Sequence, residues 1–139
     1  MEMTGLKTKF QREGAMAGTY TDVAQVANIT PPQPEREVVD IEDLDPADEI
    51  KRKLPSLIDA GEVSLTLNFD PAETSQTTLE ADFYAGDVHN YRILLPNNYA
   101  WTFPAFISGW APSEITAGDV LQVEVTFTVT GKPTLAPVV

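Results

Sequence analysis

Three aspartates in the middle of the chain are spaced as the ligands of a metal ion can be. Asp43, Asp45 and Asp48 resemble the start of a calcium-binding loop, in which carboxylates alternate along the chain. Such a loop also needs a glycine at its sixth position and a closing glutamate, and this segment has neither. The sequence therefore predicts no metal site, and the three carboxylates are left for another kind of contact.

Other groups that could support catalysis are scarce. The chain has one histidine, His89, and no cysteine, which excludes thiolate metal sites and gives little support to an imidazole-based triad. We expect His89 to be a strand residue with a solvated or hydrogen-bonded ring. There is no glycine-rich phosphate loop or nucleophile elbow, and no pair of carboxylates stands out as catalytic. We therefore expect no enzymatic activity and no cofactor.

The charge balance is strongly acidic, because nine Lys and Arg residues against 21 Asp and Glu residues give a formal net charge of −12. Proteins that grip nucleic acid neutralise its phosphates with Lys and Arg, so this balance argues against such a function. It fits solubility alone, or a surface that lets a polyanion pass. Apolar runs are short, and residues 1–9 lack the pattern of a secretory signal, so we expect no membrane span and no secretion.

Two segments alternate between apolar and polar residues. Every second side chain is apolar in residues 61–71 (GEVSLTLNFDP) and in residues 120–130 (VLQVEVTFTVT). Successive side chains of a strand point to opposite faces, so each segment predicts a strand with one apolar and one polar face. The apolar face must cover a core. The pattern leaves open whether the polar face meets bulk water, a partner or something that the protein encloses.

The clearest helix signal lies between these two strands. Asp70 is a candidate N-cap, Pro71 suits the first helical position, and Gly86 is placed to end the helix in a left-handed conformation. These signals predict a helix over residues 71–85, with Leu79 and Phe83 on the face that covers the sheet.

Further strands are predicted from residues rich in β-formers. They are residues 6–12, residues 19–29 (one strand, bulged near Ala24), residues 35–41, and a hairpin of residues 88–95 and 99–110 in which Pro104 marks an edge or a bulge. The fold class is therefore mainly β: an antiparallel β-sandwich or barrel of six to seven strands flanked by one α-helix, in a single domain of residues 1–139.

Residues 40–60 change in character. An acidic, unpatterned part is followed at once by Lys51, Arg52 and Lys53. A loop of this length without regular structure is uncommon in a compact domain, and it is usually either functional or disordered. We expect a long charged loop over about residues 40–60.

Three stretches of the chain resemble a known family. They are residues 54–71 (LPSLIDAGEVSLTLNFDP), residues 90–113 (NYRILLPNNYAWTFPAFISGWAPS) and residues 123–135 (VEVTFTVTGKPTL). With the helix that follows residue 71, they look like the tail tube (major tail) proteins of long, non-contractile-tailed bacteriophages. The N-terminal GLKTKFQREG and TYTDVAQVANITPP are similar to the beginning of those proteins.

This resemblance implies a structural virion protein. The subunits would form hexameric rings that stack into a hollow tube, and double-stranded DNA would pass through without specific binding. One sheet of each subunit would join its neighbours in an inner β-barrel, while the long loop, an N-terminal arm (residues 1–5) and a C-terminal arm (residues 131–139) reach between rings. The implied partners are other tail proteins (tip initiator, tape measure, terminator), with assembly in the host bacterial cytoplasm and the virion tail as the final location.

The expected contact residues follow from this reading. Candidate channel-lining residues are Ser64, Thr66, Asn68, Gln122, Glu124, Thr126 and Thr128. Candidate inter-ring residues are Asp43, Asp45, Asp48, Lys51, Arg52 and Lys53, because complementary charge sets register between neighbours. If six subunits each give four strands, a barrel of about 24 strands at about 4.8 Å spacing and about 40° tilt has a backbone diameter of roughly 48 Å, which leaves room for a duplex.

Two other functions are compatible with the same elements. A free-standing β-sandwich binding module would use the aromatic side chains of the 88–110 hairpin, since Phe103 and Phe106 are expected on opposite faces of one strand. A tail-terminator or a contractile-type inner tube protein would share the fold and assemble differently.

Overall fold

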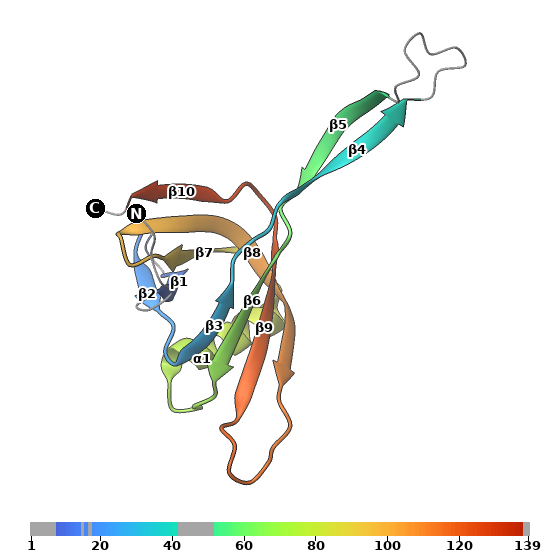
Figure 1. Ribbon diagram of the computed structural model, residues 1–139. Coiled ribbons are helices and arrows are strands. Elements are labelled where there is room, and N and C mark those ends of the chain that lie inside the picture. The colour runs from blue at the N-terminus through green and yellow to red at the C-terminus, as the bar shows by residue number, and fades with distance from the viewer. Residues whose placement is uncertain (1–7, 15, 17, 42–51, 138–139) are drawn as a thin grey trace.

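The computed structural model describes residues 8–14, 16, 18–41 and 52–137, and in this part of the chain it has ten strands and one helix (Figure 1). The strands are β1 (Lys9–Glu13), β2 (Tyr20–Asp22), β3 (Val26–Thr30), β4 (Glu35–Ile41), β5 (Arg52–Asp59), β6 (Glu62–Asn68), β7 (His89–Leu94), β8 (Tyr99–Pro112), β9 (Gln122–Val129) and β10 (Thr134–Pro137). The helix is α1 (Thr74–Ala85).

All strand pairs are antiparallel, and the main sheet runs in the order β2-β1-β7-β8-β9-β6-β3, with β10 pairing on β8. The long strand β8 serves both halves of this sheet, because residues 100–105 pair with β7 and residues 105–112 pair with β9. The sheet therefore folds over on itself, with β1 approaching β3. The predicted fold class, an antiparallel β-protein flanked by one helix, is confirmed, but the described residues form ten strands where six to seven were predicted, because residues 19–29 divide into two strands and residues 52–59 and 134–137 add two more.

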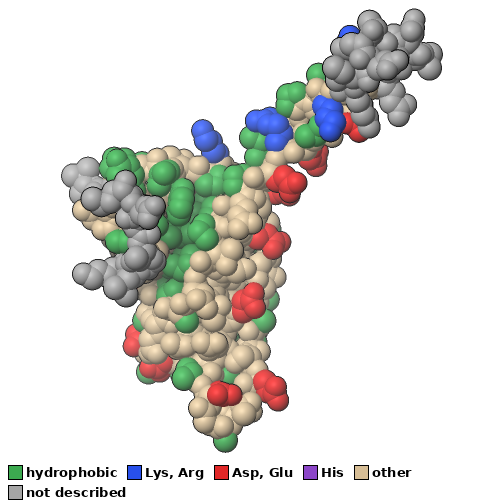
Figure 2. Space-filling model, viewed as in Figure 1, with side chains coloured by type: hydrophobic (Ala, Val, Ile, Leu, Met, Phe, Trp, Pro, Cys, Tyr) green, Lys and Arg blue, Asp and Glu red, His purple; other side chains and the backbone are tan. Residues whose placement is uncertain are grey.

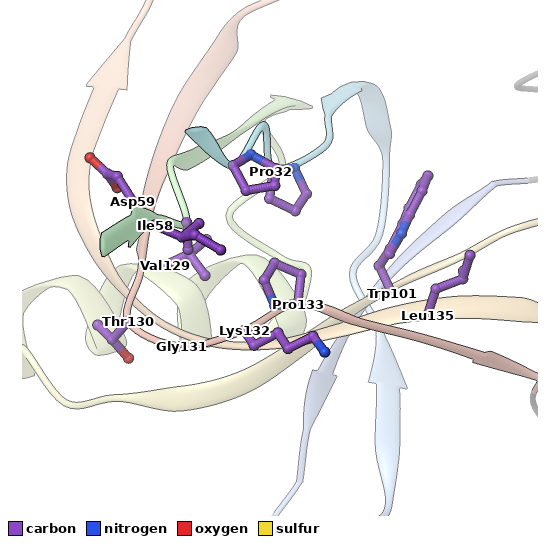
Figure 3. Close-up of a pocket in the computed structure, with 12 residues that line it drawn as sticks. Pro32, Ile58, Asp59, Trp101, Val129, Thr130, Gly131, Lys132, Pro133 and Leu135 are labelled. Atoms are coloured by element: carbon purple, nitrogen blue, oxygen red, sulfur yellow. The ribbon is translucent and has the colours of Figure 1, made fainter. Parts of the chain in front are cut away.

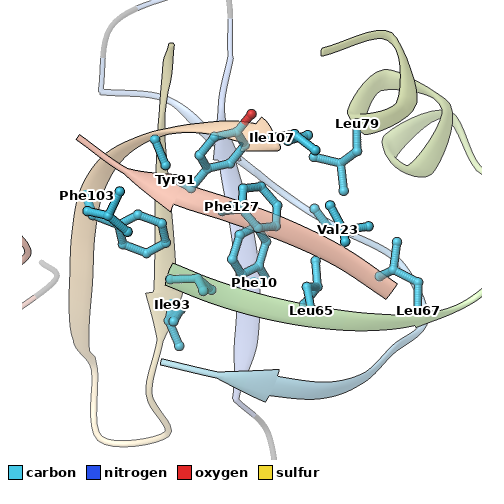
Figure 4. Packing of buried hydrophobic residues seen from close by; sticks show 14 of the residues in the cluster. Phe10, Val23, Leu65, Leu67, Leu79, Tyr91, Ile93, Phe103, Ile107 and Phe127 are labelled. Atoms are coloured by element: carbon cyan, nitrogen blue, oxygen red, sulfur yellow. The ribbon is translucent and has the colours of Figure 1, made fainter. Parts of the chain in front are cut away.

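The core lies between the two halves of the bent sheet. Phe10 of β1 and Phe127 of β9 are fully buried, and their ring centres are 5.1 Å apart (Figure 4). Tyr91 and Phe103 complete this aromatic cluster, and Leu79 of α1 joins it. The apolar side chains that alternation placed on the inner face of the strands are therefore the ones that are buried. Each fully buried Val, Leu or Phe contributes about 1.5–3 kcal/mol to the stability of the fold.

The helix starts later than its sequence signals predict. Its N-cap is Glu73, which makes no side-chain capping bond, whereas the Asp70 carboxylate accepts a hydrogen bond from the Ala72 N–H within a turn. Asp70 and Pro71 therefore form the turn that precedes the helix. An aspartate carboxylate accepts a hydrogen bond from the backbone N–H two residues later in a turn as readily as from an N–H at the start of a helix. The C-terminal prediction is correct: Gly86 ends α1 with φ 71°.

A buried glutamine fixes the first turn of α1. The Gln76 side chain accepts a hydrogen bond from the Asp70 N–H and donates to the carbonyl oxygens of Ala24 and Asn68. Every polar atom of this side chain thus has a partner, so its burial carries no penalty for an unmade hydrogen bond. Sequence reasoning missed Gln76, because a polar side chain that bonds three distant backbone groups leaves no periodic signal.

The single strand predicted over residues 19–29 is wrong. The chain turns at Ala24 and Gln25, where Gln25 has φ 57°, and the two halves become β2 beside β1 and β3 beside β6. Pro104 lies in neither an edge strand nor a bulge. It sits where β8 changes its second neighbour from β10 to β9, so its missing N–H breaks no ladder bond, and its carbonyl accepts from the Thr130 N–H.

Two segments expected to lack regular structure contain strands. Residues 52–59 of the charged segment form β5, which pairs with β4, and residues 134–137 of the expected C-terminal arm form β10 on β8. Neither strand shows alternation, because nearly all of its side chains are exposed and no core selects one face. Residues 42–51 and the expected N-terminal arm, residues 1–5, lie outside the described residues.

We call β4 and β5 the arm. Figure 1 shows it projecting away from the body of the molecule. The two strands pack mainly on each other, and a seven-residue strand at about 3.4 Å per residue is roughly 24 Å long. Isolated two-stranded hairpins are marginally stable in water, so a projecting arm of this length is suited to packing against another molecule.

Candidate functional site

The predicted channel-lining residues all lie on one face of the sheet. Their strands β6 and β9 are paired so that Ser64 is opposite Thr126, Thr66 opposite Glu124, and Asn68 opposite Gln122. The alternate pairs, such as Leu65 with Val125, are buried in the core. The two strands, considered separately in the sequence, therefore form one continuous polar surface, which we call the polar face.

Hydrogen bonds across the strands order this surface. The Gln122 amide donates to Asn68 Oδ1 at 3.0 Å, and the Thr128 hydroxyl donates to Ser108 Oγ of β8 at 2.9 Å. Short side chains that bond one another present a level, well-hydrated surface with few long groups extending from it.

The polar face continues onto β3, and its continuation on β8 also carries Phe106, opposite Thr128, and Ala111, opposite Glu124. On one side Asn28 and Thr30 of β3 are paired with Thr66 and Ser64, and on the other side residues 105–112 of β8 are paired with β9. Sequence reasoning missed Asn28, Thr30 and Ser108. β3 is short and shows no alternation, and Ser108 lies in a bulge of β8 that shifts the register, so neither could be assigned to a face from the sequence.

The charge on this surface is of one sign. The described strands β3, β6 and β9 and residues 105–112 of β8 contain no Lys or Arg, and their polar face has two carboxylates, Glu62 and Glu124, both exposed. Anionic polymers are held mainly by cations, so this surface offers a phosphate backbone no opposite charge to bind.

Both outer edges of this four-stranded region are unpaired among the described residues. β3 pairs with β6 on one side only, and residues 106–112 of β8 pair with β9 on one side only. Unpaired strand edges are templates for pairing with another chain. The geometry therefore allows the polar face to continue from one molecule into the next.

The predicted inter-ring residues belong to the arm and its connection. Arg52 and Lys53 are in β5, opposite Ile41 and Asp40 of β4. Asp43, Asp45, Asp48 and Lys51 lie outside the described residues. Figure 2 shows both Lys or Arg and Asp or Glu side chains on the arm, and further Asp and Glu side chains along the body down to the opposite end of the molecule.

The arm also exposes apolar side chains, which the sequence analysis did not anticipate. Leu57 is 79% exposed, and the other large apolar side chains that are at least about half exposed are Val38, Val39, Leu54 and Ile58. Leaving such side chains in water forgoes about 1.5–3 kcal/mol each, so a surface of this kind marks a contact with another protein. The arm therefore presents exposed apolar side chains as well as the charged ones that the sequence indicated.

One cluster of ionisable side chains lies away from both surfaces. Arg12 of β1 contacts the Asp82 carboxylate of α1, the Tyr91 hydroxyl lies 3.3 Å from the same carboxylate, and His89 Nε2 lies 3.5 Å from it. The hydrogen bond to Asp82 raises the pKa of Arg12, and burial together with the Asp82 charge raises the pKa of Tyr91. His89 is a strand residue of β7, as predicted, and its ring lies beside the Asp82 carboxylate.

The residues that the structure describes offer no site for a metal ion. Within that part of the chain, no three His, Cys, Asp or Glu side chains are grouped closely enough to hold a metal ion. A search of the described helical residues for a membrane span gives none.

Comparisons with known proteins address the fold and the family. The family model described as "Lambda phage tail tube protein, TTP" matches residues 5–136. A comparison with curated protein sequences gives no match.

Solved structures share the fold at low sequence identity. One is from the tail of an empty gene transfer agent particle refined with C6 symmetry: TM-score 0.78, 15% identity, 97% of this chain and 99% of the other covered. Another is from the SPP1 tail tube: TM-score 0.69, 14% identity, 98% and 80% covered. A third is from the sheath/tube terminator of the PVC extracellular contractile injection system: TM-score 0.73, 11% identity, 98% and 97% covered.

Proposed function

The chain belongs to the lambda phage tail tube protein family and is a structural subunit of a virion tail tube, and from this premise we propose how it builds the tube. We propose that six subunits close into a ring, that the polar face lines the bore, and that the arm joins successive rings. The observation that carries this proposal is the four-stranded polar face, which has no cation and an unpaired edge on either side.

Edge pairing explains ring closure. The β3 edge of one subunit meets the edge of β8 residues 106–112 in the next, which removes both exposed edges at once. Four strands from each of six subunits give the barrel of about 24 strands and roughly 48 Å backbone diameter expected from strand spacing and tilt. A ring of six agrees with the C6 symmetry of the gene transfer agent tail.

The polar face explains how DNA passes without binding. Hydroxyl and amide side chains such as Ser64, Thr66 and Asn68 hydrate well, and Glu62 and Glu124 repel phosphate. DNA carries one charge per about 1.7 Å of duplex, so a bore lined with Lys or Arg would hold the polymer along its whole length. We infer that the chain is acidic partly because DNA must pass through the bore without binding, and partly because net charge keeps the protein soluble.

The arm explains stacking. Its exposed apolar side chains need a cover, and Arg52 and Lys53, together with Lys51, Asp43, Asp45 and Asp48 of its connection, provide charges that set the register on a neighbouring ring. Head-to-tail contacts of this kind add rings without limit, whereas the rotation within a ring closes it.

The tube role needs no catalysis and no cofactor, and we propose that the subunits assemble in the host bacterial cytoplasm, with a tip initiator, a tape measure and a terminator as further partners. The family assignment favours this role over a free-standing binding module. Solved structures of a terminator and of a contractile sheath-tube complex share the fold, so it is the family model, that of a tail tube protein, that favours a tail tube over these assemblies.

Cryo-electron microscopy of tubes grown from the concentrated protein tests the proposal. We expect hexameric rings with Ser64, Thr66 and Glu124 facing the bore. A tube in which these side chains face outward, or in which β3 and β8 of neighbouring subunits are not paired, would refute it.

A further inference from the structure

Two exposed apolar features lie at opposite ends of the four-stranded region. Glu62 and Thr128 pair at the end near the base of the arm, and Asn68 and Gln122 pair at the other end. Beyond the first pair lies an apolar groove. Beyond the second lies the loop that connects β8 to β9, residues 113–121, at the lower end of the molecule in Figure 1.

The groove has a volume of about 650 Å³ and is lined mainly by apolar side chains (Figure 3). Its principal lining residues are Pro32, Pro34, Ile58, Trp101, Pro133 and Leu135. Leu135 of β10 is 53% exposed, and Trp101 of β8 is partly buried. Prolines and a strand-borne tryptophan lose little conformational freedom on binding, so a partner that entered this groove would meet a low entropy cost.

The β8–β9 loop carries the most exposed apolar side chains at the other end. Ile115 is 84% exposed and Val120 is 66% exposed. The loop has a defined shape: the Ser113 N–H donates to the Gln122 carbonyl at 2.7 Å, and the Asp119 N–H donates to the Thr116 carbonyl at 3.2 Å. Ile115 is therefore held on an ordered projection, which lowers the entropy cost of inserting it into a groove.

Charge distinguishes the two ends further. The loop carries Glu114 and Asp119, and the whole segment from residue 93 to residue 131 contains no Lys or Arg. Lys132 lines the groove together with Asp59, and Arg36, which is paired with Ile58 of the lining, donates a hydrogen bond to the Ser56 carbonyl. The match between the loop and the groove is therefore mainly apolar, with Lys132 as the cation of the lining that the acidic loop can meet.

We propose that the β8–β9 loop of one subunit docks into this groove of a second copy in the adjacent ring, with Ile115 and Val120 against Trp101, Pro133 and Leu135. The proposal rests on the head-to-tail stacking proposed above, because stacking of that kind brings opposite ends of two copies together. The groove lies at the base of the arm, so the arm passes along the outside of the adjacent ring while the loop of that ring fills the groove. Two separate parts of the chain, the arm and the β8–β9 loop, then both contribute to the contact between adjacent rings.

The absence of cysteine from the sequence gives a direct test. In the variant Ile115→Cys with Leu135→Cys both changes are at exposed positions, so the fold is unaffected. Tubes are grown under reducing conditions, oxidised, and separated on a non-reducing gel. We expect a ladder of cross-linked chains that extends past the hexamer, because a contact between rings links chains without limit.

Controls separate this contact from others. Ile115→Cys alone should give no species larger than a dimer, and Leu57→Cys with Leu135→Cys reports whether the arm occupies the groove instead. Three results would overturn the inference: oxidised tubes without a ladder, a ladder that stops at the hexamer, or cross-linking through Leu57. Failure of the unmodified chain to form any tube would instead refute the proposed function.

A second variant needs no cross-link. Ile115→Asp should leave the melting temperature of the monomer unchanged and reduce tube length at least tenfold, while Thr116→Asp, which adds the same charge at the adjacent exposed position, should form longer tubes than Ile115→Asp. Tubes of normal length from Ile115→Asp would contradict the docking of this loop.

Discussion

The side chains of Arg12 and Asp82 form a two-point ion pair between β1 and α1, with Nε 2.5 Å from Oδ2 and Nη2 2.9 Å from Oδ1. The Asp82 side chain is only 8% exposed, and Tyr91 adds a third hydrogen bond to it. This cluster attaches the helix to the sheet half that does not carry the polar face. It therefore holds the outer layer of the subunit in place and leaves the four-stranded region free for assembly.

Removing either partner of this pair should destabilise the monomer. We expect Arg12→Ala and Asp82→Ala each to cost about 3 kcal/mol, because each leaves a partly buried charge without its partner. The double variant should cost clearly less than the sum of the two, since the second change removes a group that has already lost its contact. Urea unfolding of the three variants measures this coupling, and additive effects would show that the pair contributes nothing of its own.

Alkaline pH should weaken the fold through Tyr91. Burial raises the pKa of Tyr91, so the folded chain keeps the phenol proton above about pH 10, where the unfolded chain releases it. The Tyr91 phenol therefore makes its full contribution to the free energy of unfolding below about pH 10. Above about pH 10 this contribution falls by up to about 1.4 kcal/mol per pH unit. Tyr91→Phe should flatten the fall in stability between pH 9 and 11 in thermal melts. A residual slope from Tyr20, whose pKa burial also raises, is expected to remain.

Gly61 should tolerate no side chain. It joins the arm to β6 with φ 84°, and a Cβ there would lie 2.8 Å from the Gln33 carbonyl oxygen. Gly118 has φ 94° and no neighbour within 4 Å of such a Cβ, so it controls for backbone strain alone. We expect Gly61→Ala to cost about 1–3 kcal/mol more than Gly118→Ala in chemical unfolding, as overpacking does. Equal costs would mean that the arm moves aside freely.

Reversing the two charges of the polar face should turn the bore into a DNA-binding surface. Glu62 and Glu124 are exposed, so Glu62→Lys with Glu124→Lys should fold and assemble. Its tubes should bind short duplex DNA about tenfold or more tightly at low salt than the neutral control Glu62→Gln with Glu124→Gln, with a steep salt dependence. Fluorescence anisotropy at several salt concentrations measures both. Binding equal to that of the control would place these side chains outside the bore.

Polar substitution on the arm should stop stacking without unfolding the subunit. Val38 and Leu57 are exposed in the monomer, so Val38→Ser with Leu57→Ser should change its stability by less than about 1 kcal/mol. Negative-stain microscopy should show rings or monomers in place of tubes. Glu37→Ser, on the same strand and also exposed, should form normal tubes. Normal tubes from the double variant would remove the arm from the stacking contact.

Alternation along the chain was sufficient to predict much of the fold. The pattern around Leu65 and Val125 predicted both the buried face and the polar face, because the period of a strand fixes the side of each residue as soon as one face is known to be apolar. The helix and its end at Gly86 were predicted for the same kind of reason: a left-handed glycine is a local property.

The sequence could not show which strands are neighbours. That Ser64 and Thr126 share one surface with Asn28 and Ser108 depends on register between segments far apart in the chain, and no local rule contains that information. The same is true of Gln76 and of the Arg12–Asp82 pair, whose partners are distant in sequence. Of the arm, the strand over residues 35–41 was predicted and is β4, whereas β5 escaped prediction because no core imposes a pattern on it.

Sequence by itself thus determined the secondary structure of the amphipathic segments, the acidity and the family resemblance, since each is encoded within a few residues or in composition. Only the tertiary structure decided that the polar residues form one cation-free face with two open edges, that the charged segment is an arm, and that a groove and a loop lie at opposite ends. These depend on long-range strand pairing, which is decided by the packing of the whole core.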